Sequence, residues 1–249
     1  MTEALDRLVG ARSGGAQCAP VRDVVADLDA AYAVQAGWVG TRRAAGARVV
    51  GRKIGFTNPA ARARLGADHP DFGVLLDEMA RPTGGTIEAG LLRQPRVEVE
   101  IAFVLARDLA AVDDPRDAVG EVVAALEIVD SRIADWDITL VDTVADNASA
   151  ALFVLGDAVD AGAVEPRDCA TTLWHNGEVV AHGVGADSYG DPYLALGWLA
   201  DAVRRHGEPV RAGDVVLTGA LGLVVPALPG GEFRAVVAGV GEVSATFAR

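Results

Sequence analysis

Residues 96–105 read Arg96-Val-Glu-Val-Glu-Ile-Ala-Phe-Val-Leu105, and their alternation predicts a β-strand. Successive side chains of a strand point to opposite faces, so Glu98 and Glu100 share one face and five apolar side chains share the other. Two carboxylates about 7 Å apart along a strand repel each other and are costly to bury. A divalent cation held by oxygen ligands relieves that cost. The stretch therefore predicts a core strand that contributes two carboxylates to a metal site.

A third carboxylate follows in Ala124-Ala-Leu-Glu-Ile-Val129. The neighbours of Glu127 are apolar on both sides, which is typical of a strand buried on both faces. An ionised Glu is unstable there without a partner, and a magnesium or manganese ion shared with Glu98 and Glu100 would provide one. The alternative is that Glu98 and Glu100 form an ordinary solvated strand face.

The composition narrows the class of protein. The 249 residues suit one large domain, or a small arm and a core domain. Apolar residues make up 51% and charged residues 23%, so we expect a soluble globular protein. Lys and Arg number 22 against 35 Asp and Glu, and the net charge of −13 argues against a nucleic-acid or anionic-membrane partner.

Cysteine usage and hydropathy favour a cytoplasmic enzyme. Cys18 and Cys169 form neither a disulfide framework nor a zinc pattern. The first residues lack the basic and apolar regions of a secretory signal, and no run of about 18 apolar residues could span a bilayer.

Pairs of a capping residue and a proline predict where three helices begin. The pairs are Asn58-Pro59 for a helix to about Leu65, Asp114-Pro115 for a helix to about Val123, and Asp191-Pro192 for a helix to about His206. A helix is also predicted over residues 23–45, whereas residues 1–20 show no clear period and predict a loose start. Strand-like segments dominate the second half without a regular βαβ rhythm, so an α+β or mainly β core with covering helices fits best.

Three further side chains are candidates for chemistry. Lys53 lies between Gly51 and Gly55, so it is either a surface lysine or a cation that a substrate oxygen can approach closely. Asp71 lies in an Asp-rich loop, where turn formation is the alternative to catalysis. Ser149 ends a polar loop and could donate to an anionic substrate oxygen, although local capping is the simpler interpretation of such loops.

Other catalytic patterns are lacking in the sequence. The histidines form no H-E-x-x-H spacing, and Gly183-Val-Gly185 lacks the third glycine of a dinucleotide-binding loop. Neither a phosphate-binding G-x-x-x-x-G-K-[ST] nor a nucleophilic G-x-S-x-G sequence occurs.

Several long motifs follow one another over about residues 23–247. They are Val50-Gly-Arg-Lys-Ile-Gly-Phe-Thr57, Leu65-Gly-Ala-Asp-His-Pro-Asp-Phe-Gly73, Pro95-Arg-Val-Glu-Val-Glu-Ile-Ala102, Ala125-Leu-Glu-Ile-Val-Asp-Ser-Arg-Ile133, Leu140-Val-Asp-Thr-Val-Ala-Asp-Asn-Ala-Ser149 and Gly213-Asp-Val-Val-Leu-Thr-Gly-Ala-Leu-Gly222. In this order they resemble the 2-keto-4-pentenoate hydratase family of the fumarylacetoacetate hydrolase superfamily.

The resemblance implies an α+β fold, a mixed β-sandwich roll of the fumarylacetoacetate hydrolase type with a smaller helical N-terminal part. We expect a mainly helical region over residues 1–70 and a catalytic β-roll domain over residues 71–249. The resemblance also implies a homo-oligomer, often a pentamer or decamer, and allows association with a pathway partner enzyme.

The implied activity is that of a Mg²⁺- or Mn²⁺-dependent lyase in the catabolism of aromatic compounds. It adds water to a 2-hydroxy-2,4-dienoate, a tautomer of 2-oxopent-4-enoate, and gives a 4-hydroxy-2-oxo acid. By the resemblance, the metal carboxylates are Glu98, Glu100 and Glu127, and the catalytic residues are Lys53 and Asp71. The substrate-binding positions are Ser149, Thr218 and Gly219.

Three other activities remain open. A 4-oxalocrotonate-type decarboxylase would use the same metal site on a 2-oxo-3-enedioate, and a non-catalytic or repurposed member would act as a partner subunit or on another 2-oxo acid. A C–C hydrolase needs a water-activating His-Glu pair, for which His69 is the one histidine in the first hundred residues. Asn58-Pro59 and Ser188-Tyr-Gly-Asp-Pro-Tyr193 depart from forms common in the family, which leaves the substrate tail open.

Overall fold

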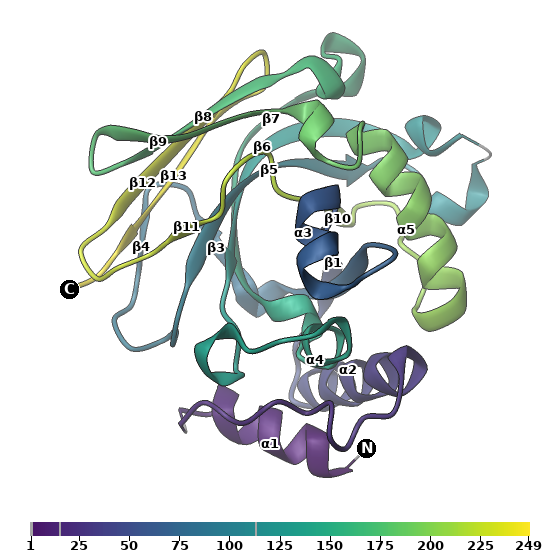
Figure 1. Ribbon diagram of the computed structural model, residues 1–249. Coiled ribbons are helices and arrows are strands. Elements are labelled where there is room, and N and C mark those ends of the chain that lie inside the picture. Colours follow the sequence, from purple (N-terminus) through teal and green to yellow (C-terminus); the bar gives the residue numbers. More distant parts are fainter. Residues whose placement is uncertain (1, 15, 113) are drawn as a thin grey trace.

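Two mixed β-sheets form the centre of the computed structural model, which describes residues 2–14, 16–112 and 114–249 (Figure 1). The larger sheet has the strand order β2-β1-β10-β5-β6-β7-β3, and β11 pairs with β5. Its strands are β1 (Val49–Gly55), β2 (Asp71–Leu76), β3 (Ala80–Pro82), β5 (Arg96–Leu105), β6 (Val119–Val129), β7 (Ala150–Asp160), β10 (Val215–Leu217) and β11 (Val225–Pro226). Most pairs are antiparallel, but β1 with β10 and β3 with β7 are parallel.

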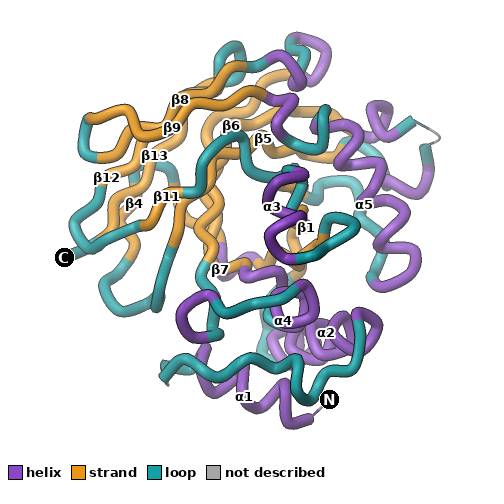
Figure 2. The backbone as a smooth tube through the Cα atoms, in the orientation of Figure 1, coloured by secondary structure: helices purple, strands orange, loops and turns teal. Residues whose placement is uncertain are grey.

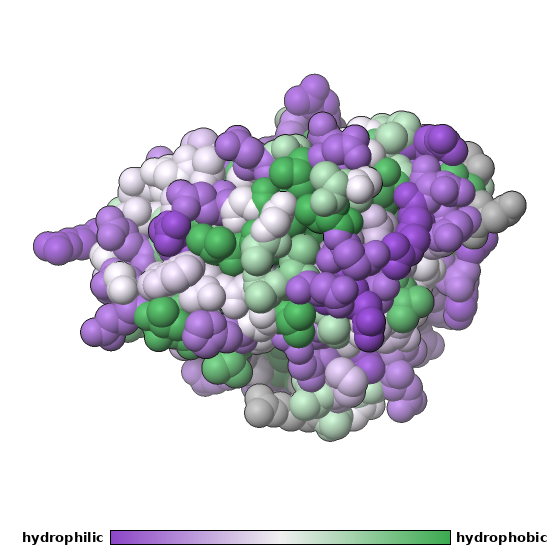
Figure 3. Space-filling view, turned by 90° about the horizontal axis from the view of Figure 1, so that it is seen from above, coloured by the Kyte–Doolittle hydropathy of each residue, from purple (hydrophilic) through white to green (hydrophobic). Residues whose placement is uncertain are grey.

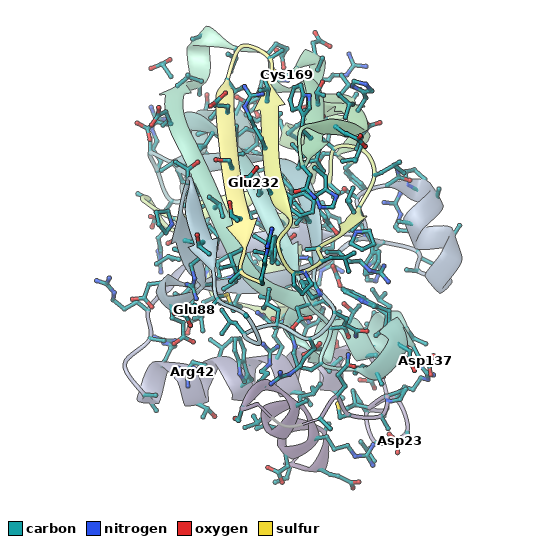
Figure 4. All side chains as sticks on the ribbon, turned by 90° about the vertical axis from the view of Figure 1, so that its left-hand side faces the viewer. Asp23, Arg42, Glu88, Asp137, Cys169 and Glu232 are labelled. Carbon is teal, nitrogen blue, oxygen red and sulfur yellow. The ribbon has the colours of Figure 1, made fainter. Side chains whose placement is uncertain are left out.

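The smaller sheet has the strand order β4-β13-β12-β8-β9. Its strands are β4 (Gly85–Ile87), β8 (Ala170–His175), β9 (Glu178–Val184), β12 (Glu232–Val237) and β13 (Gly241–Phe247). Strand β13 contacts β6 and β7 of the larger sheet. Figure 4 shows this sheet facing the viewer, with Glu232 on β12 and Cys169 beside the start of β8.

Helices cover the larger sheet away from the smaller one (Figures 1 and 2). They are α1 (Thr2–Arg12), α2 (Leu28–Ala44), α3 (Pro59–Leu65), α4 (Leu140–Ala145) and α5 (Pro192–His206). Helix α2 contacts α1, α4 and α5. In Figure 4, Asp23 and Arg42 mark this helical end of the molecule. Together, mixed sheets and covering helices confirm the α+β class.

Because side chains alternate along β5, the two faces of the larger sheet have different environments. Val97, Ile101 and Phe103 are fully buried in the main apolar core, together with residues of β12 and β13. The opposite face carries Glu98 and Glu100 and continues into a second apolar cluster that includes Ala102, Leu217 and Trp38. The carboxylates therefore lie between the sheet and the helical layer.

The helix predictions had mixed outcomes. Asn58 and Asp191 cap α3 and α5 through their side chains, as predicted. The helix predicted from Asp114 is wrong, because a single 3₁₀ turn over Pro115–Ala118 leads directly into β6. The loose start predicted for residues 1–20 is also wrong over α1, where Ala4, Leu8 and Ala11 are buried.

No helix in the described ranges is long and apolar enough to cross a bilayer. Seen from above in Figure 3, hydrophilic residues dominate the margins of the surface, and hydrophobic residues gather near its middle.

Candidate metal centre and active site

The pairing of β5 with β6 brings the three glutamates together. Glu98 lies directly opposite Glu127 in the antiparallel register, and Glu100 lies two residues further along β5. One carboxylate oxygen from each residue lies within 4.8 Å of the other two. Glu100 and Glu127 are fully buried, and Glu98 is partly exposed. Such a cluster of hard oxygen atoms is the donor set that Mg²⁺ and Mn²⁺ prefer.

Three of the six carboxylate oxygens are buried without a hydrogen bond from the described residues. Glu100 Oε2 accepts a 2.7 Å hydrogen bond from the Gly219 N–H. Glu100 Oε1 and both Glu127 oxygens are buried and make no hydrogen bond within the described part of the chain. Buried carboxylate oxygens need compensation, and a cation at the convergence point would supply it. The residues present therefore fit a divalent metal.

The protonation of the cluster agrees with this interpretation. Burial, reinforced by the charge of Glu127, raises the pKa of Glu98 to about 7. Burial, again with Glu127 and also Glu98, raises the pKa of Glu100 well above its usual range. Both shifts oppose ionisation of Glu98 and Glu100 when no cation is bound, and a bound metal would favour their ionised forms.

Lys53 adds a positive charge at the edge of the cluster. It is only 3% exposed, and its Nζ lies 3.2 Å from Glu127 Oε1 and donates a 2.9 Å hydrogen bond to the Ala148 carbonyl. Burial lowers the pKa of Lys53, but the carboxylates of Glu127 and Asp71 outweigh it and raise the pKa above its ordinary value. The raised pKa favours the ammonium form of Lys53.

Asp71 begins β2 and lies opposite Gly55 of β1. It is fully buried, and neither of its carboxylate oxygens makes a hydrogen bond to a described residue. Burial raises its pKa to about 6, with Lys53 opposing and Glu127 adding to the rise. A Cβ at position 55 would lie 2.2 Å from Asp71 Oδ1, so the glycine is needed for this close approach.

Ser149 ends a turn with an unusual backbone. Asn147, Ala148 and Ser149 have φ angles of 58°, 51° and 56°, a left-handed conformation that is unfavourable for residues with a Cβ. Ser149 Oγ lies 3.3 Å from Thr143 Oγ1, and the Asn147 side chain bonds both the N–H and the carbonyl of Val74. The turn is thus held by tertiary contacts and not by local preference.

Thr218 and Gly219 follow directly after β10 and lie beside Glu100. Thr218 Oγ1 donates to the Ile101 carbonyl at 2.8 Å, and the Gly219 N–H donates to Glu100. Sequence reasoning missed two neighbours of this turn. Ser188 donates from Oγ to the Thr218 carbonyl at 2.6 Å, and Thr57 packs so closely that a Cβ at Gly219 would lie 2.3 Å from its Oγ1. Thr57 ends the motif Val50–Thr57, and Ser188 begins the segment Ser188–Tyr193 that departs from the common family form, but neither residue was predicted to contact this turn.

One large cavity lies away from the glutamate cluster. A space of about 810 Å³ between α2, β1 and the end of α5 is lined by Tyr32, Arg52, Phe72 and other residues outside the glutamate cluster. Arg52 and Lys53 are adjacent in β1 and therefore project from opposite faces of the sheet. We place the site at the carboxylates because the chemically competent groups converge there.

Comparison with known proteins shows the family to which this chain belongs. The chain matches the fumarylacetoacetate (FAA) hydrolase C-terminal family over residues 21–248 and belongs to it. Within that family it belongs with the 2-keto-4-pentenoate hydratases, so the resemblance noted from the motifs is confirmed.

Two curated relatives and one solved structure illustrate the match. The 2-keto-4-pentenoate hydratase of Burkholderia vietnamiensis is 50% identical over 248 residues, covering 97% of this chain and 95% of the relative. The 2-hydroxyhexa-2,4-dienoate hydratase of Comamonas testosteroni is 38% identical over 251 residues, with 97% and 95% coverage. The 4-oxalocrotonate decarboxylase from Pseudomonas putida G7, complexed with magnesium and adipate, superposes with a TM-score of 0.92 at 29% identity, covering 99% of this chain and 97% of that one.

Proposed function

We propose that this protein is a hydro-lyase that adds water to a 2-hydroxy-2,4-dienoate and gives a 4-hydroxy-2-oxo acid in the breakdown of aromatic compounds. The observation that carries the proposal is the convergence of three carboxylates, two of them fully buried, beside Lys53 and Asp71. Its support from relatives is the 50% identity to a 2-keto-4-pentenoate hydratase over nearly the whole chain.

Glu98, Glu100 and Glu127 would hold the divalent cation, which we propose to be Mg²⁺ or Mn²⁺. The buried oxygens of Glu100 and Glu127 that lack hydrogen bonds support this assignment, as does the magnesium in the solved decarboxylase. When bound, the cation supplies Lewis-acid stabilisation of the negative charge that develops on the 2-oxo oxygen of the substrate.

Lys53 would bind the substrate carboxylate or enolate oxygen. Its ammonium is fixed between Ala148 and Glu127, so little reorganisation is needed when charge develops nearby. The positive charge of Lys53 also favours the ionised form of Asp71 when the reaction requires a base.

Asp71 would transfer protons. Conversion of the dienol to the 2-oxo-3-enoate moves one proton from the enol oxygen to C5, and water then adds its oxygen at C4 and a proton at C3. A carboxyl with a pKa of about 6 has both of its forms populated near neutral pH, which suits an acid in one step and a base in the next.

Ser149, Thr218 and Gly219 complete the proposed substrate end. The Ser149 hydroxyl, buried against Thr143, could turn to donate to a substrate oxygen. Since the Gly219 N–H is bonded to Glu100, we propose that Thr218 and Gly219 shape the site mainly through that ligand.

Further structural expectations accompany this proposal. The two sheets form the roll of the superfamily, with a mainly helical region over residues 1–70, which also contributes β1 and Lys53 to the larger sheet, and a catalytic domain over residues 71–249. The protein acts as a homo-oligomer, a pentamer or decamer, in the cytoplasm. Sedimentation of the purified protein tests the assembly.

An ultraviolet assay tests the reaction. Loss of 2-hydroxypenta-2,4-dienoate absorbance should require Mg²⁺ or Mn²⁺ and stop with EDTA, and the product should be heavier than the substrate by one water. Decarboxylation of 4-oxalocrotonate is the second candidate, because the solved decarboxylase superposes over almost the whole chain. Release of CO₂ from that substrate, without hydration of the pentadienoate, would overturn the hydratase assignment.

A further inference from the structure

The turn over Asn147, Ala148 and Ser149 has a conformation that its sequence does not favour. Three consecutive residues with a Cβ adopt left-handed φ angles, which L-residues otherwise visit singly. Such a conformation persists only where surrounding contacts impose it, and it tends to occur at functional sites. The contacts that stabilise the left-handed conformation here therefore indicate the function of the turn.

The side chain of Asn147 makes the contact that ties the turn to the larger sheet. Val74 N–H donates to Asn147 Oδ1 at 2.8 Å, and Asn147 Nδ2 donates to the Val74 carbonyl at 3.0 Å. Both groups belong to β2, which is the edge strand of that sheet. Asn147 is fully buried, so its amide replaces the missing neighbouring strand at this position.

Gly73 allows the turn to reach the sheet. A Cβ at this position would lie 2.6 Å from the Asn147 carbonyl oxygen and 3.2 Å from Lys53 Cδ. A side chain at position 73 would therefore clash with the turn, and the glycine allows the turn, β2 and the Lys53 side chain to pack together.

This packing orients the backbone carbonyl of Ala148 toward Lys53. Ala148 O receives the 2.9 Å hydrogen bond from Lys53 Nζ, which holds the ammonium 3.2 Å from Glu127. From this geometry we infer that Asn147 is a positioning residue: it forces the turn into the left-handed conformation that aims the Ala148 carbonyl at Lys53. The inference rests on the proposed role of Lys53 in the reaction.

A glycine substitution separates two possible roles of Asn147, which are to adopt the left-handed φ and to form hydrogen bonds to Val74. Asn147→Gly accepts a left-handed φ without cost but removes both bonds to Val74. Asn147→Asp keeps the size and one acceptor but loses the donor to the Val74 carbonyl. The matched control is Asn176→Gly, because Asn176 also has a left-handed φ, of 52°, but lies exposed in the hairpin between β8 and β9.

We expect Asn147→Gly to fold and to bind Mg²⁺ in calorimetric titration as the wild type does. Its kcat for pentadienoate hydration should fall by about 10- to 100-fold with a smaller change in KM, because the Lys53 ammonium interacts more strongly with the enolate charge that develops in the reaction than with the bound substrate. Asn147→Asp should lose kcat in the same way, whereas Asn176→Gly should keep it.

Crystal structures of Asn147→Gly and the wild type provide a readout that does not depend on the substrate. We expect the hydrogen bond from Lys53 Nζ to Ala148 O to be broken in the variant. If the bond is intact, or if both Asn147 variants keep the wild-type kcat, the inference is overturned. Should the wild type fail to hydrate the pentadienoate, the proposed function fails, and the crystal structures still decide whether Asn147 orients Lys53.

Discussion

Asp71 gives the sharpest test of how the site is built, because its burial has a cost that can be measured without substrate. Its pKa is about 6 in the folded chain against an ordinary 3.8. At pH 8 the folded chain must ionise a carboxyl that prefers its proton, whereas the unfolded chain ionises it freely. The difference corresponds to about 3 kcal/mol of lost stability at pH 8 and about half of that at pH 5, since the cost disappears below the unfolded pKa.

Asp71→Asn removes this cost, because a neutral amide replaces the carboxylate. We therefore expect the variant to be more stable than the wild type by about 3 kcal/mol at pH 8 in EDTA, a rise in Tm of roughly 6–12 °C for a chain of this size. The advantage should shrink at pH 5. Scanning calorimetry at matched protein concentration measures both values, and the same variant should have lost turnover.

Asp77→Asn is a control just after β2, where the pKa of the carboxylate is shifted in the opposite direction. The pKa of Asp77 is lowered by hydrogen bonds from the Arg48 N–H and guanidinium, so losing its charge should not stabilise the protein at pH 8. If Asp71→Asn is less stable than the wild type at pH 8, or if its advantage does not depend on pH, our account of Asp71 is wrong.

The remaining predictions concern the metal and Lys53. Glu100→Gln and Glu127→Gln should abolish the rise in Tm that Mg²⁺ gives the wild type, together with activity; a normal Mg²⁺ response in either would remove that residue from the ligand set. Lys53→Ala should keep the Mg²⁺ response but lose about 100- to 1000-fold in kcat, and wild-type turnover by this variant would exclude an electrostatic role. Because the pKa of Glu98 is raised to about 7, Mg²⁺ binding at pH 6 should release protons, and the affinity for Mg²⁺ should increase as the pH rises through 7. Calorimetry in two buffers of different ionisation enthalpy measures the proton release. Equal binding enthalpies in the two buffers would contradict the prediction.

The glutamate cluster could be predicted because it depends on short-range rules. Alternation puts Glu98 and Glu100 on one face, and the burial of Glu127 requires a partner. Antiparallel pairing of two strands that are close in sequence then brings all three together. The caps of α3 and α5 were predictable for the same reason, since Asn58 and Asp191 bond to their own first turns.

Long-range contacts explain what the sequence did not reveal. Asp114 and Pro115 form a helix start locally, but the apolar run that follows is drawn into the sheet by pairing with β5. Helix α1 depends on burial of Leu8 and on Arg12, which stacks on Trp38 of α2. The left-handed turn likewise has no glycine to announce it, because distant partners such as Val74 hold it in place.

The outer edge of β2 has a consequence for how copies of this chain behave together. An open strand edge invites another polypeptide to add to the sheet, which is a common route to aggregation. Here, side chains occupy the outward-facing groups of β2: Gln35 Nε2 donates to the Phe72 carbonyl, Asn147 satisfies both groups of Val74, and Met79 Sδ accepts from the Leu76 N–H. At Phe72, Val74 and Leu76 the strand that carries Asp71 therefore leaves fewer free backbone groups for another polypeptide, which disfavours intermolecular strand addition at this edge.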